Sequence, residues 1–367
     1  MNKKISIIGI SAVAVLWAVL TLWVWFKPAG DMSTSERRPL AQFPELSLDA
    51  VLSGEFITKF EDYTLDQFPL RDTFRQIKSL FHYNVMMQSD NNDIYVEDGY
   101  AAKLEYPLNQ NSLDYANQRF DAVYNKYLKG TNTNVYFTVI PDKSFYIGEK
   151  NGYLVMDYKK LFSNIQGNNE WATYIDIAGN LTVEDYYKTD THWRQERILD
   201  VAQLLCTKMG AEQPTADMFV QGKVEKPFYG VYYGQAALPM PSEDMYVLSS
   251  DTLNQCIVTD FETNTKTVVY DKEMLNSKDM YDYYLGGAKA LLTIENPNAK
   301  TDKELVIFRD SFGSSIAPLF MESYSKVTLI DIRYIKSDFI GSFIKFDNQD
   351  VLFLYSTLVL NSSSTLK

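Results

Sequence analysis

Histidine and cysteine are scarce in this chain of 367 residues, which contains two of each: His82, His192, Cys206 and Cys256. The two histidines are 110 residues apart and no Cys-x-x-Cys pair occurs, so no spacing typical of a zinc site is present. A glycine-rich phosphate-binding loop is also missing from the sequence. We therefore expect neither a metal nor a cofactor, and any chemistry that needs an imidazole has two candidates.

Positive charge is also in short supply, because 35 Lys and Arg face 47 Asp and Glu, for a net charge of −12. Nucleic acids and anionic polymers are bound by basic surfaces, so the balance argues against both as partners and leaves a neutral or weakly charged polymer open. The 26 tyrosines suit a surface that meets sugars, but an aromatic-rich core explains them as well. The two cysteines permit one disulfide, although Cys206 shares a helical face with Val201 and Leu205, which favours a buried thiol.

One long apolar run is present, from Ile5 to Phe26, and its 22 residues are enough to cross a bilayer. A cleaved secretory peptide has a shorter apolar core and a small-x-small exit, whereas this run ends in the bulky residues Trp23, Trp25 and Phe26. We interpret it as a single-pass signal anchor. The polar and basic residues 2–4 place the N-terminus in the cytoplasm and the rest of the chain outside the cell membrane.

Three segments are expected along the chain. Residues 1–29 form the cytoplasmic tip and the transmembrane anchor, and residues 30–110 form a stalk followed by two helices joined by a turn at 68–72. Residues 111–367 form the main domain. Within it, short strand-like pieces between polar turns predict an inserted antiparallel lobe at about 211–285.

The main domain alternates strands and helices. Residues 304–308, 326–332 and 351–355 predict apolar strands, and the two segments between them predict helices of 10 to 14 residues. Upstream, helices are expected at 112–130 and 193–209 and strands at 134–144 and 172–177. This alternation is typical of parallel βαβ units, so we expect a three-layer α/β domain.

Ser311 follows the predicted strand at 304–308 within the sequence Arg309-Asp310-Ser311-Phe312-Gly313. Catalytic groups of open parallel sheets lie at the carboxyl ends of strands, where a serine hydroxyl projects and free helix amides can stabilise an oxyanion. The alternative is that Asp310 or Ser311 only caps the helix, which is the usual role of those residue types.

A nucleophilic serine needs a base, and His192 is the better candidate because His82 falls at the end of a predicted helix. In the octapeptide YYKTDTHW, residues 186–193, Asp190 can orient the imidazole and Trp193 can exclude water. Thr191 is a plausible N-cap, which would place His192 in a first helical turn whose dipole keeps it a neutral base. The alternative is an ordinary capped helix start with Trp193 in the core.

Four sequence segments resemble the DHHW protein family: ERRPLAQFPEL near the membrane, YTLDQFPLRD at 63–72, DTHW at 190–193 and RDSFG at 309–313. The likeness extends from about residue 36 to the end, and the family is in turn similar to SGNH-hydrolase-like alginate O-acetyltransferases. The chain departs from the family pattern at Thr191, where DHHW proteins have histidine, and at Ala288, where an asparagine of the oxyanion hole is expected.

The resemblance implies a circularly rearranged SGNH, flavodoxin-like fold in which Ser311, His192 and Asp190 form the triad. Gly286 and Gly287 then correspond to oxyanion residues, and the weaker candidates for substrate contact are Arg309, Arg333, Tyr334 and Trp193. The implied activity is O-acetyl transfer to an exported polysaccharide or cell-wall glycan, with acyl groups supplied by a membrane-bound acyltransferase. An esterase, or a noncatalytic glycan-binding or scaffold protein with the same fold, remains the alternative.

Overall fold

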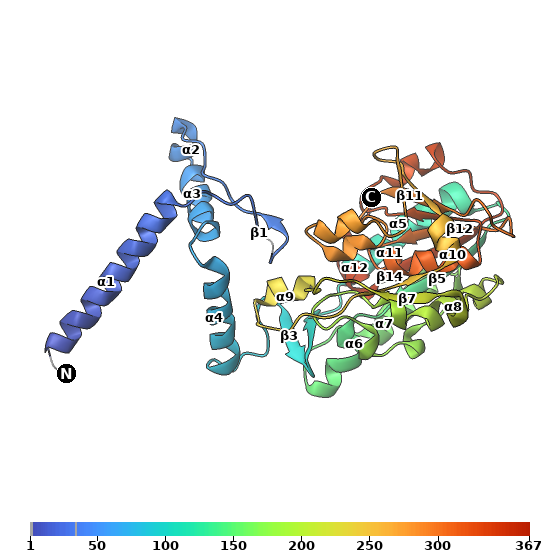
Figure 1. Ribbon diagram of the computed structural model, residues 1–367. Helices are drawn as coiled ribbons and strands as arrows, with labels where there is room; N and C mark the ends of the chain where they lie inside the picture. Colours follow the sequence, from blue (N-terminus) through green and yellow to red (C-terminus); the bar gives the residue numbers. More distant parts are fainter. Residues whose placement is uncertain (1–2, 34) are drawn as a thin grey trace. The chain divides into compact units, whose positions relative to one another are not determined.

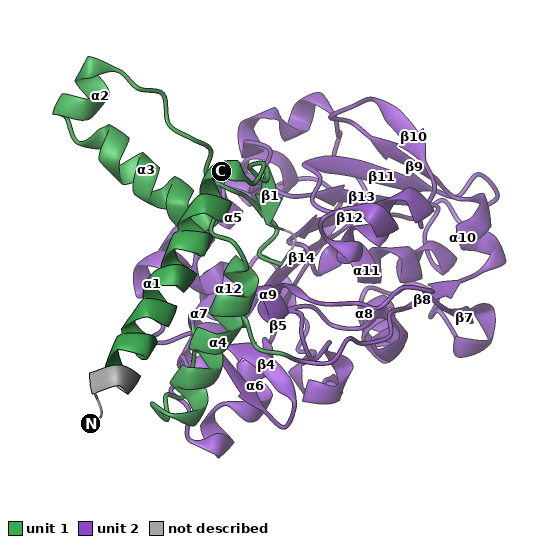
Figure 2. Cartoon of the chain, turned by 60° about the vertical axis from the view of Figure 1, so that its left-hand side comes forward, with its two compact units in different colours: residues 1–91, 237–239 green, residues 92–236, 240–367 purple. Residues whose placement is uncertain are grey.

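The computed structural model describes residues 3–33 and 35–367, so Asn2 of the predicted cytoplasmic flank and Thr34 of the predicted stalk lie outside the described residues. The chain divides into two compact units (Figure 2): residues 1–91 with 237–239, and residues 92–236 with 240–367. The division lies before the boundary at 110 that the sequence suggested. The hairpin of β3 (Ile94–Glu97) and β4 (Tyr100–Lys103) belongs to the second unit, where the Ala101 amide donates to the carbonyl of Lys188.

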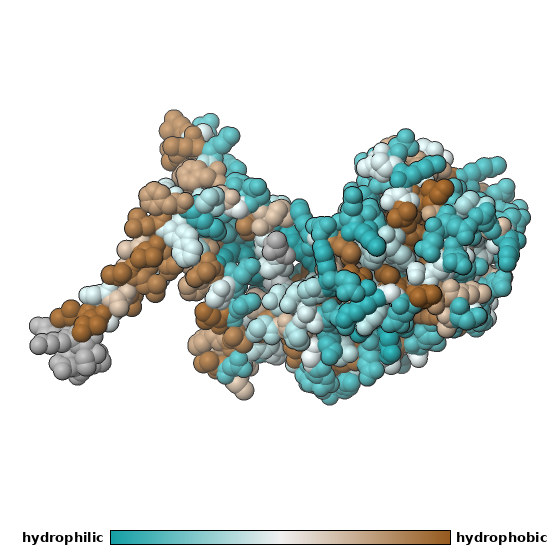
Figure 3. Space-filling view, in the orientation of Figure 1, coloured by the Kyte–Doolittle hydropathy of each residue, from teal (hydrophilic) through white to brown (hydrophobic). Residues whose placement is uncertain are grey.

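The first unit consists mainly of helices: α1 (Lys3–Phe26), α2 (Leu48–Leu52), α3 (Glu55–Asp66) and α4 (Arg71–Asn84), with a short ladder of β1 (Met32–Ser33) and β2 (Arg38–Pro39) (Figure 1). The turn predicted at 68–72 separates α3 from α4, with Leu70 in the left-handed region at φ 57°. Segment Ser6–Phe26 of α1 has a mean hydropathy of 2.4 and is long enough to cross a membrane. Figure 3 shows apolar side chains over α1 and α2.

The second unit is built on an eight-stranded sheet in the order β10-β9-β11-β13-β12-β14-β5-β6. Its strands are β5 (Asn134–Ile140), β6 (Thr173–Tyr174), β9 (Ile257–Asp260), β10 (Thr265–Thr267), β11 (Leu291–Glu295), β12 (Glu304–Arg309), β13 (Lys326–Ile330) and β14 (Asp350–Ser356). The five strands from β13 to β6 are parallel, whereas β11, β9 and β10 pair antiparallel. The carboxyl ends of the parallel strands therefore share one edge.

Helices cover both faces of this sheet. One apolar cluster joins the inner sides of α8 (Leu199–Lys208) and α11 (Gly313–Ile316) to strand residues such as Ile307 and Leu352. The other cluster joins α5 (Gln110–Val123), α7 (Tyr158–Asn168) and α12 (Thr357–Asn361) to Phe308 and Phe353 on the opposite face. The three-layer α/β fold expected from the sequence is confirmed, because alternate residues of each central strand are buried on opposite faces.

Several expected helices are shorter than the apolar spacing indicated. The helix after β12 has one α-helical turn, α11, and continues as a 3-10 helix over Ala317–Glu322, because Pro318 has no N–H for an α-helical bond. The segment after β13 is a 3-10 helix over Ser337–Ser342, and it contains Gly341, a residue that weakens helices. The strand predicted at 172–177 shrinks to the two residues of β6.

The predicted insertion at about 211–285 does not form one separate lobe. Its first half contains the antiparallel pair of β7 (Val220–Lys223) and β8 (Tyr246–Ser249), with α9 (Val231–Ala236) between them and α10 (Asp251–Gln255) after β8. Its second half is the hairpin β9–β10, which extends the central sheet through β11.

The two cysteines are buried as free thiols, and burial raises the pKa of each to about 12.

Candidate active site

Residues 186–193 form a tight turn, not the start of a helix. The Tyr187 amide donates to the carbonyl of His192 at 3.1 Å, and Tyr186 bridges Trp193. A 3-10 turn begins only at Gln195 and α8 only at Leu199, so the prediction of a helix from 193 with Thr191 as its N-cap was wrong. The helix N-terminus that the sequence suggested for His192 is therefore not present in this segment.

The turn is closed by the carboxylate of Asp190. Asp190 Oδ1 accepts from the backbone N–H of His192 at 3.0 Å and lies 2.6 Å from His192 Nδ1. The short Asp-x-His spacing therefore folds back on itself, as aspartate does in turns. Both side chains are buried, and the carboxylate fixes the imidazole so that Nε2 faces away from the turn.

His192 Nε2 lies 2.7 Å from Ser311 Oγ, 119 positions away in the sequence. Ser311 follows β12 in the turn that leads into α11. The neighbouring Asp310 caps this turn, because its Oδ1 accepts from the Phe312 amide at 3.0 Å and its Oδ2 from the Ser356 amide at 2.8 Å. The capping role thus belongs to Asp310, and the hydroxyl of Ser311 is left for the histidine.

The ring of His192 is held between aromatic side chains. Tyr281 stacks on it with 3.8 Å between ring centroids and 8° between planes, and Phe312 lies at 4.9 Å. Ser315 Oγ accepts from Tyr281 at 2.7 Å and from Trp193 Nε1 at 2.9 Å. Trp193 is fully buried, so its place is in the core behind the site. Sequence reasoning missed Tyr281, because nothing in the tyrosine-rich segment 281–284 singles it out.

Two backbone amides of the predicted insertion also bind Asp190 and its neighbour Thr189. The Val231 amide donates to Asp190 Oδ2 at 2.8 Å, and the Gly230 amide donates to Thr189 Oγ1 at 2.9 Å. A Cβ added at Gly230 would lie 2.3 Å from backbone and Cβ atoms of Asp190, closer than real Cβ contacts. Only glycine fits at this position.

Glu243 holds the beginning of the same turn. Its carboxylate accepts from the amides of Lys188 at 2.7 Å and Thr189 at 2.8 Å, and from the Thr189 hydroxyl at 2.9 Å. The two segments of the insertion are tied to each other, because Phe228 and Glu243 pair backbone to backbone. Gly230, Val231 and Glu243 therefore support the turn at residues 186–193, a role that their sequence alone does not indicate.

Gly230→Ala is expected to destabilise the protein by about 3 kcal/mol and to slow any ester hydrolysis that uses His192, because the methyl group pushes Asp190 out of place. Thermal unfolding and p-nitrophenyl acetate hydrolysis measure the two effects. Gly179→Ala is the matched control, since a Cβ there meets nothing within 4 Å. If Gly230→Ala behaved like the control in both measurements, the contact with Asp190 would not matter.

The two predicted oxyanion residues, Gly286 and Gly287, differ in whether their backbone N–H is already hydrogen-bonded. Gly287 donates its N–H to the carbonyl of Tyr284 at 3.3 Å. By contrast, within residues 3–33 and 35–367, the amides of Gly286 and Ser311 make no intramolecular hydrogen bond in this structure. A free N–H next to the nucleophile is the group that stabilises an oxyanion, so Ser311 itself is the better donor.

Arg309 lies beneath the serine turn and is fully buried. Its guanidinium donates to Ser314 Oγ at 3.2 Å and, weakly, to the carbonyl of Gly287 at 3.5 Å, and it lies 4.0 Å from Asp331. Burial lowers the pKa of the guanidinium. Arg309 thus links the turn that contains Ser311 to the turn that contains Gly287. Because its side chain is fully buried, a substrate cannot reach it.

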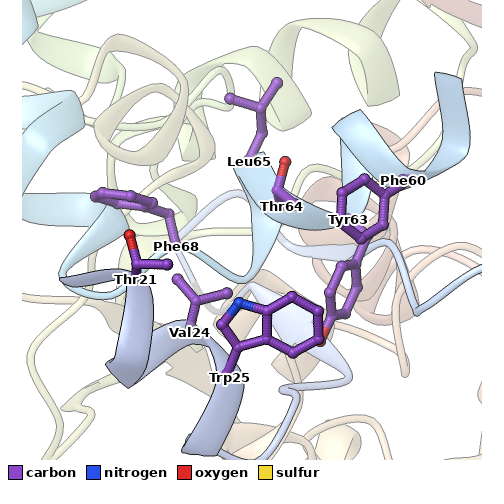
Figure 4. A pocket seen from close by; sticks show the side chains of 8 residues that line it. All are labelled: Thr21, Val24, Trp25, Phe60, Tyr63, Thr64, Leu65 and Phe68. Carbon is purple, nitrogen blue, oxygen red and sulfur yellow. The ribbon is translucent and has the colours of Figure 1, made fainter. Parts of the chain in front are cut away.

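Arg333 and Tyr334, the other predicted substrate contacts, line a cavity that does not include Asp190, His192 or Ser311. Arg333 forms a two-pronged ion pair with Asp331, and with Tyr334 it lines a cavity of about 600 Å³ next to Tyr115 and Arg119. Another cavity, of about 360 Å³, lies in the first unit, where Trp25 of α1 lies beside Tyr63 of α3 and Phe68 also lines the wall (Figure 4). None of the triad residues lines either cavity. His82 lies in α4 of the first unit, as its position at a helix end suggested.

Within the described part of the chain, no group of three or more His, Cys, Asp or Glu side chains could hold a metal ion. The site consists instead of one hydrogen-bonded line, Asp190 to His192 to Ser311, with a free amide at the serine. This arrangement can activate a serine hydroxyl and receive the negative charge of a tetrahedral intermediate.

A model of the DHHW protein family matches residues 158–330, a range that contains all three of these residues. The structure is similar to that of a DHHW family protein from Eubacterium siraeum, with a TM-score of 0.60, 20% identity, and coverage of 74% of this chain and 93% of that one. The resemblance to the DHHW family that the motifs indicated is confirmed.

Two further solved structures show similarity to this one. PatB1 of Bacillus cereus, determined with a sulfonyl adduct, has a TM-score of 0.58 and 18% identity over 73% of this chain and 95% of its own. The O-acetyltransferase domain of Pseudomonas putida AlgJ has a TM-score of 0.42 and 11% identity over 73% and 92%. No curated protein sequence matches the chain. At 18 to 20% identity, the likeness to the Eubacterium siraeum protein and to PatB1 establishes a shared fold alone.

Proposed function

We propose that this protein is a membrane-anchored, extracytoplasmic O-acyltransferase that modifies an exported polysaccharide or cell-wall glycan. The observation that supports the proposal best is the line of hydrogen bonds from Asp190 through His192 to Ser311, with 2.6 and 2.7 Å between the linked atoms. A binding or scaffold protein that had lost catalysis would have no need to keep all three groups within bonding distance.

In the first half-reaction, Ser311 Oγ attacks the carbonyl carbon of an acyl donor while His192 Nε2 takes the hydroxyl proton. The developing oxyanion is stabilised by the free amide of Ser311, and Asp190 stabilises the imidazolium. When the tetrahedral intermediate collapses, His192 returns the proton to the leaving oxygen. The product is an acyl ester of Ser311.

In the second half-reaction, His192 removes the proton of a sugar hydroxyl, whose oxygen attacks the carbonyl carbon of the acyl-enzyme. The bond from the acyl carbon to Ser311 Oγ then breaks, His192 returns the proton to Oγ, and the acyl group stays on the sugar. An esterase uses the same first step and water in the second, so the two activities differ in the nucleophile that the site admits. Acyl transfer is favoured because DTHW and RDSFG resemble the DHHW family, which is in turn similar to the alginate O-acetyltransferases.

The apolar helix α1 is consistent with a signal anchor or a signal peptide, and as an anchor it would hold the enzyme beside the membrane. Acyl groups made inside the cell must cross that membrane to reach an extracytoplasmic site. A membrane-bound acyltransferase that supplies them is therefore part of the proposal.

Product analysis separates transfer from hydrolysis. The full chain in detergent is incubated with p-nitrophenyl acetate and soluble peptidoglycan fragments or neutral glucan oligosaccharides, and O-acetyl groups on the glycan are measured by mass spectrometry. We expect glycan acetylation that rises with acceptor concentration. Release of acetate alone would favour an esterase, and p-nitrophenol release no faster than with a Ser311→Ala variant would contradict both.

A further inference from the structure

A buried lysine lies below the turn that contains Asp190 and His192. Lys143 is the first residue of α6 (Lys143–Ile147), which begins shortly after β5 at the active edge of the sheet. Only 2% of Lys143 is exposed, and it is the one lysine in the buried set among the side chains that the structure describes. Lysine is almost never fully buried unless its ammonium group has hydrogen-bond partners, so we identified the groups that Lys143 contacts.

The partners of Lys143 are backbone carbonyls. Its Nζ donates to the carbonyl of Tyr187 at 2.8 Å and to that of Lys188 at 3.2 Å, and it lies 5.0 Å from the ring centroid of Tyr232. Tyr232 in turn donates its hydroxyl to Thr191 Oγ1 at 3.1 Å. Lys143 thus contacts the turn at residues 186–193 directly, through the carbonyls of Tyr187 and Lys188, and indirectly, through the ring of Tyr232.

These carbonyls lie at the start of the turn whose end is His192. The Tyr187 amide bonds the His192 carbonyl, so a shift at residue 187 is passed straight to the histidine. Glu243 accepts from the amides of Lys188 and Thr189, so Lys188 is held at its N–H by Glu243 and at its carbonyl by Lys143. Sequence reasoning missed Lys143, which it placed in the predicted strand at 134–144, whereas β5 ends at Ile140 and Lys143 begins α6.

We propose that Lys143 is a positioning residue for acyl transfer: it fixes the carbonyls of Tyr187 and Lys188 and thereby aims His192 at Ser311. The inference rests on the proposed function and assigns a role to a group outside the triad. It predicts a loss of turnover without a loss of substrate binding. A shift of about 1 Å in a catalytic group is enough to lower a rate by about 10²-fold.

The charge of Lys143 is not essential to this role. Burial lowers its pKa to about 7, with Asp190, Glu243 and Asp142 as the acidic groups that face it. An ammonium and a neutral amine both donate hydrogen bonds, so the carbonyls are held in either state. Above pH 7 the folded state binds fewer protons at Lys143 than the unfolded state does, so this group makes the protein more stable as the pH rises from about 7 to 10.5.

The kinetic test compares Lys143→Met, which keeps the length and removes the donors, with Ser144→Ala on the same helix. Ser144 is equally buried, but its hydroxyl bonds the carbonyl of Lys103 and the hydroxyl of Tyr95, away from the turn. With p-nitrophenyl acetate and the full chain, we expect kcat of Lys143→Met to fall by about 10- to 100-fold with KM within about twofold. We expect Ser144→Ala to lower only the melting temperature, and Lys143→Arg, which retains donors, to recover part of kcat.

A spectroscopic readout does not depend on activity. The chain has two histidines, so ¹⁵N-histidine labelling gives a simple spectrum in which the Nδ1–H of His192, bonded to Asp190, is assigned with a His82→Gln variant. We expect this signal to shift or broaden in Lys143→Met and to stay in place in Ser144→Ala. We also expect the melting temperature of the wild type minus that of Lys143→Met to increase between pH 6.5 and 9.

The outcomes separate this inference from the proposed function. If the wild type hydrolyses the ester and Lys143→Met matches it in kcat and in the histidine spectrum, the positioning role is wrong and the proposed function stands. If Lys143→Met and Ser144→Ala lose kcat in proportion to their melting temperatures, Lys143 is merely structural. If the wild type itself is no better than Ser311→Ala, the proposed function fails, and the histidine spectrum still reports whether Lys143 positions the ring.

Discussion

Ser311→Ala is expected to lower kcat/KM for p-nitrophenyl acetate by about 10³-fold or more, with a melting temperature close to that of the wild type. The hydroxyl is the group that would form the acyl ester, and His192 has no other nucleophile within bonding distance in the described part of the chain. The fold should tolerate the change, because the cap of this turn is made by Asp310 and not by the serine.

Covalent labelling gives a second measure of the same prediction. Intact-mass spectrometry after treatment with phenylmethylsulfonyl fluoride should show one adduct on the wild type and none on Ser311→Ala. Ser314→Ala is the matched control, since Ser314 is a buried serine three residues further along that accepts from Arg309. Labelling of Ser311→Ala to the same extent as the wild type would place the reactive nucleophile elsewhere.

Asp190→Asn is expected to lower kcat by about 10²- to 10⁴-fold with little change in KM. The carboxylate accepts three hydrogen bonds, from Nδ1 and the amide of His192 and from the amide of Val231. An asparagine has one acceptor oxygen, so its NH₂ group must face either Val231 or the histidine. When it faces the histidine, Nδ1 becomes an acceptor and Nε2 carries the proton, so the ring can no longer take the proton of Ser311.

The Asp190→Asn prediction is checked by steady-state kinetics beside Asp176→Asn. Asp176 forms the same local turn, with its carboxylate accepting from the Ala178 amide, but it does not contact the histidine. We expect the control to keep wild-type kcat and the ¹⁵N spectrum of Asp190→Asn to report the exchanged tautomer of His192. Retention of more than a tenth of kcat by Asp190→Asn would mean that the carboxylate does not orient the base.

The main elements of the site were predictable because local patterns identify them. Apolar strands of five to seven residues, each followed by a polar turn, indicate a parallel sheet whose carboxyl ends meet at one edge. Ser311 directly follows such a strand, and Asp190 and His192 are two positions apart in a chain with almost no histidine. Their spacing permits the contact that the structure has at 2.6 Å.

The helix predicted at 193–209 begins late, at Leu199, and the delay has a physical cause. The apolar spacing of that segment fits one helix, but the backbone of 187–192 is bound by tertiary partners that a local pattern does not contain. Glu243, Val231 and Lys143 hold it as a turn, and α8 starts only at Leu199. Tertiary contacts outweighed local propensity here because three separate segments bind the same six residues.

The sequence by itself determined the layered α/β fold, the apolar N-terminal helix and the three groups that would do the chemistry, because each depends on residue type and short spacing. Only the tertiary structure decided that His192 reaches Ser311, that Gly230 must lack a side chain, and that a buried lysine and a stacked tyrosine hold the base. These features depend on contacts between segments 40 to 120 residues apart, such as Val231 with Asp190 and His192 with Ser311. Contacts of that kind form only when the sheet brings the ends of its strands together.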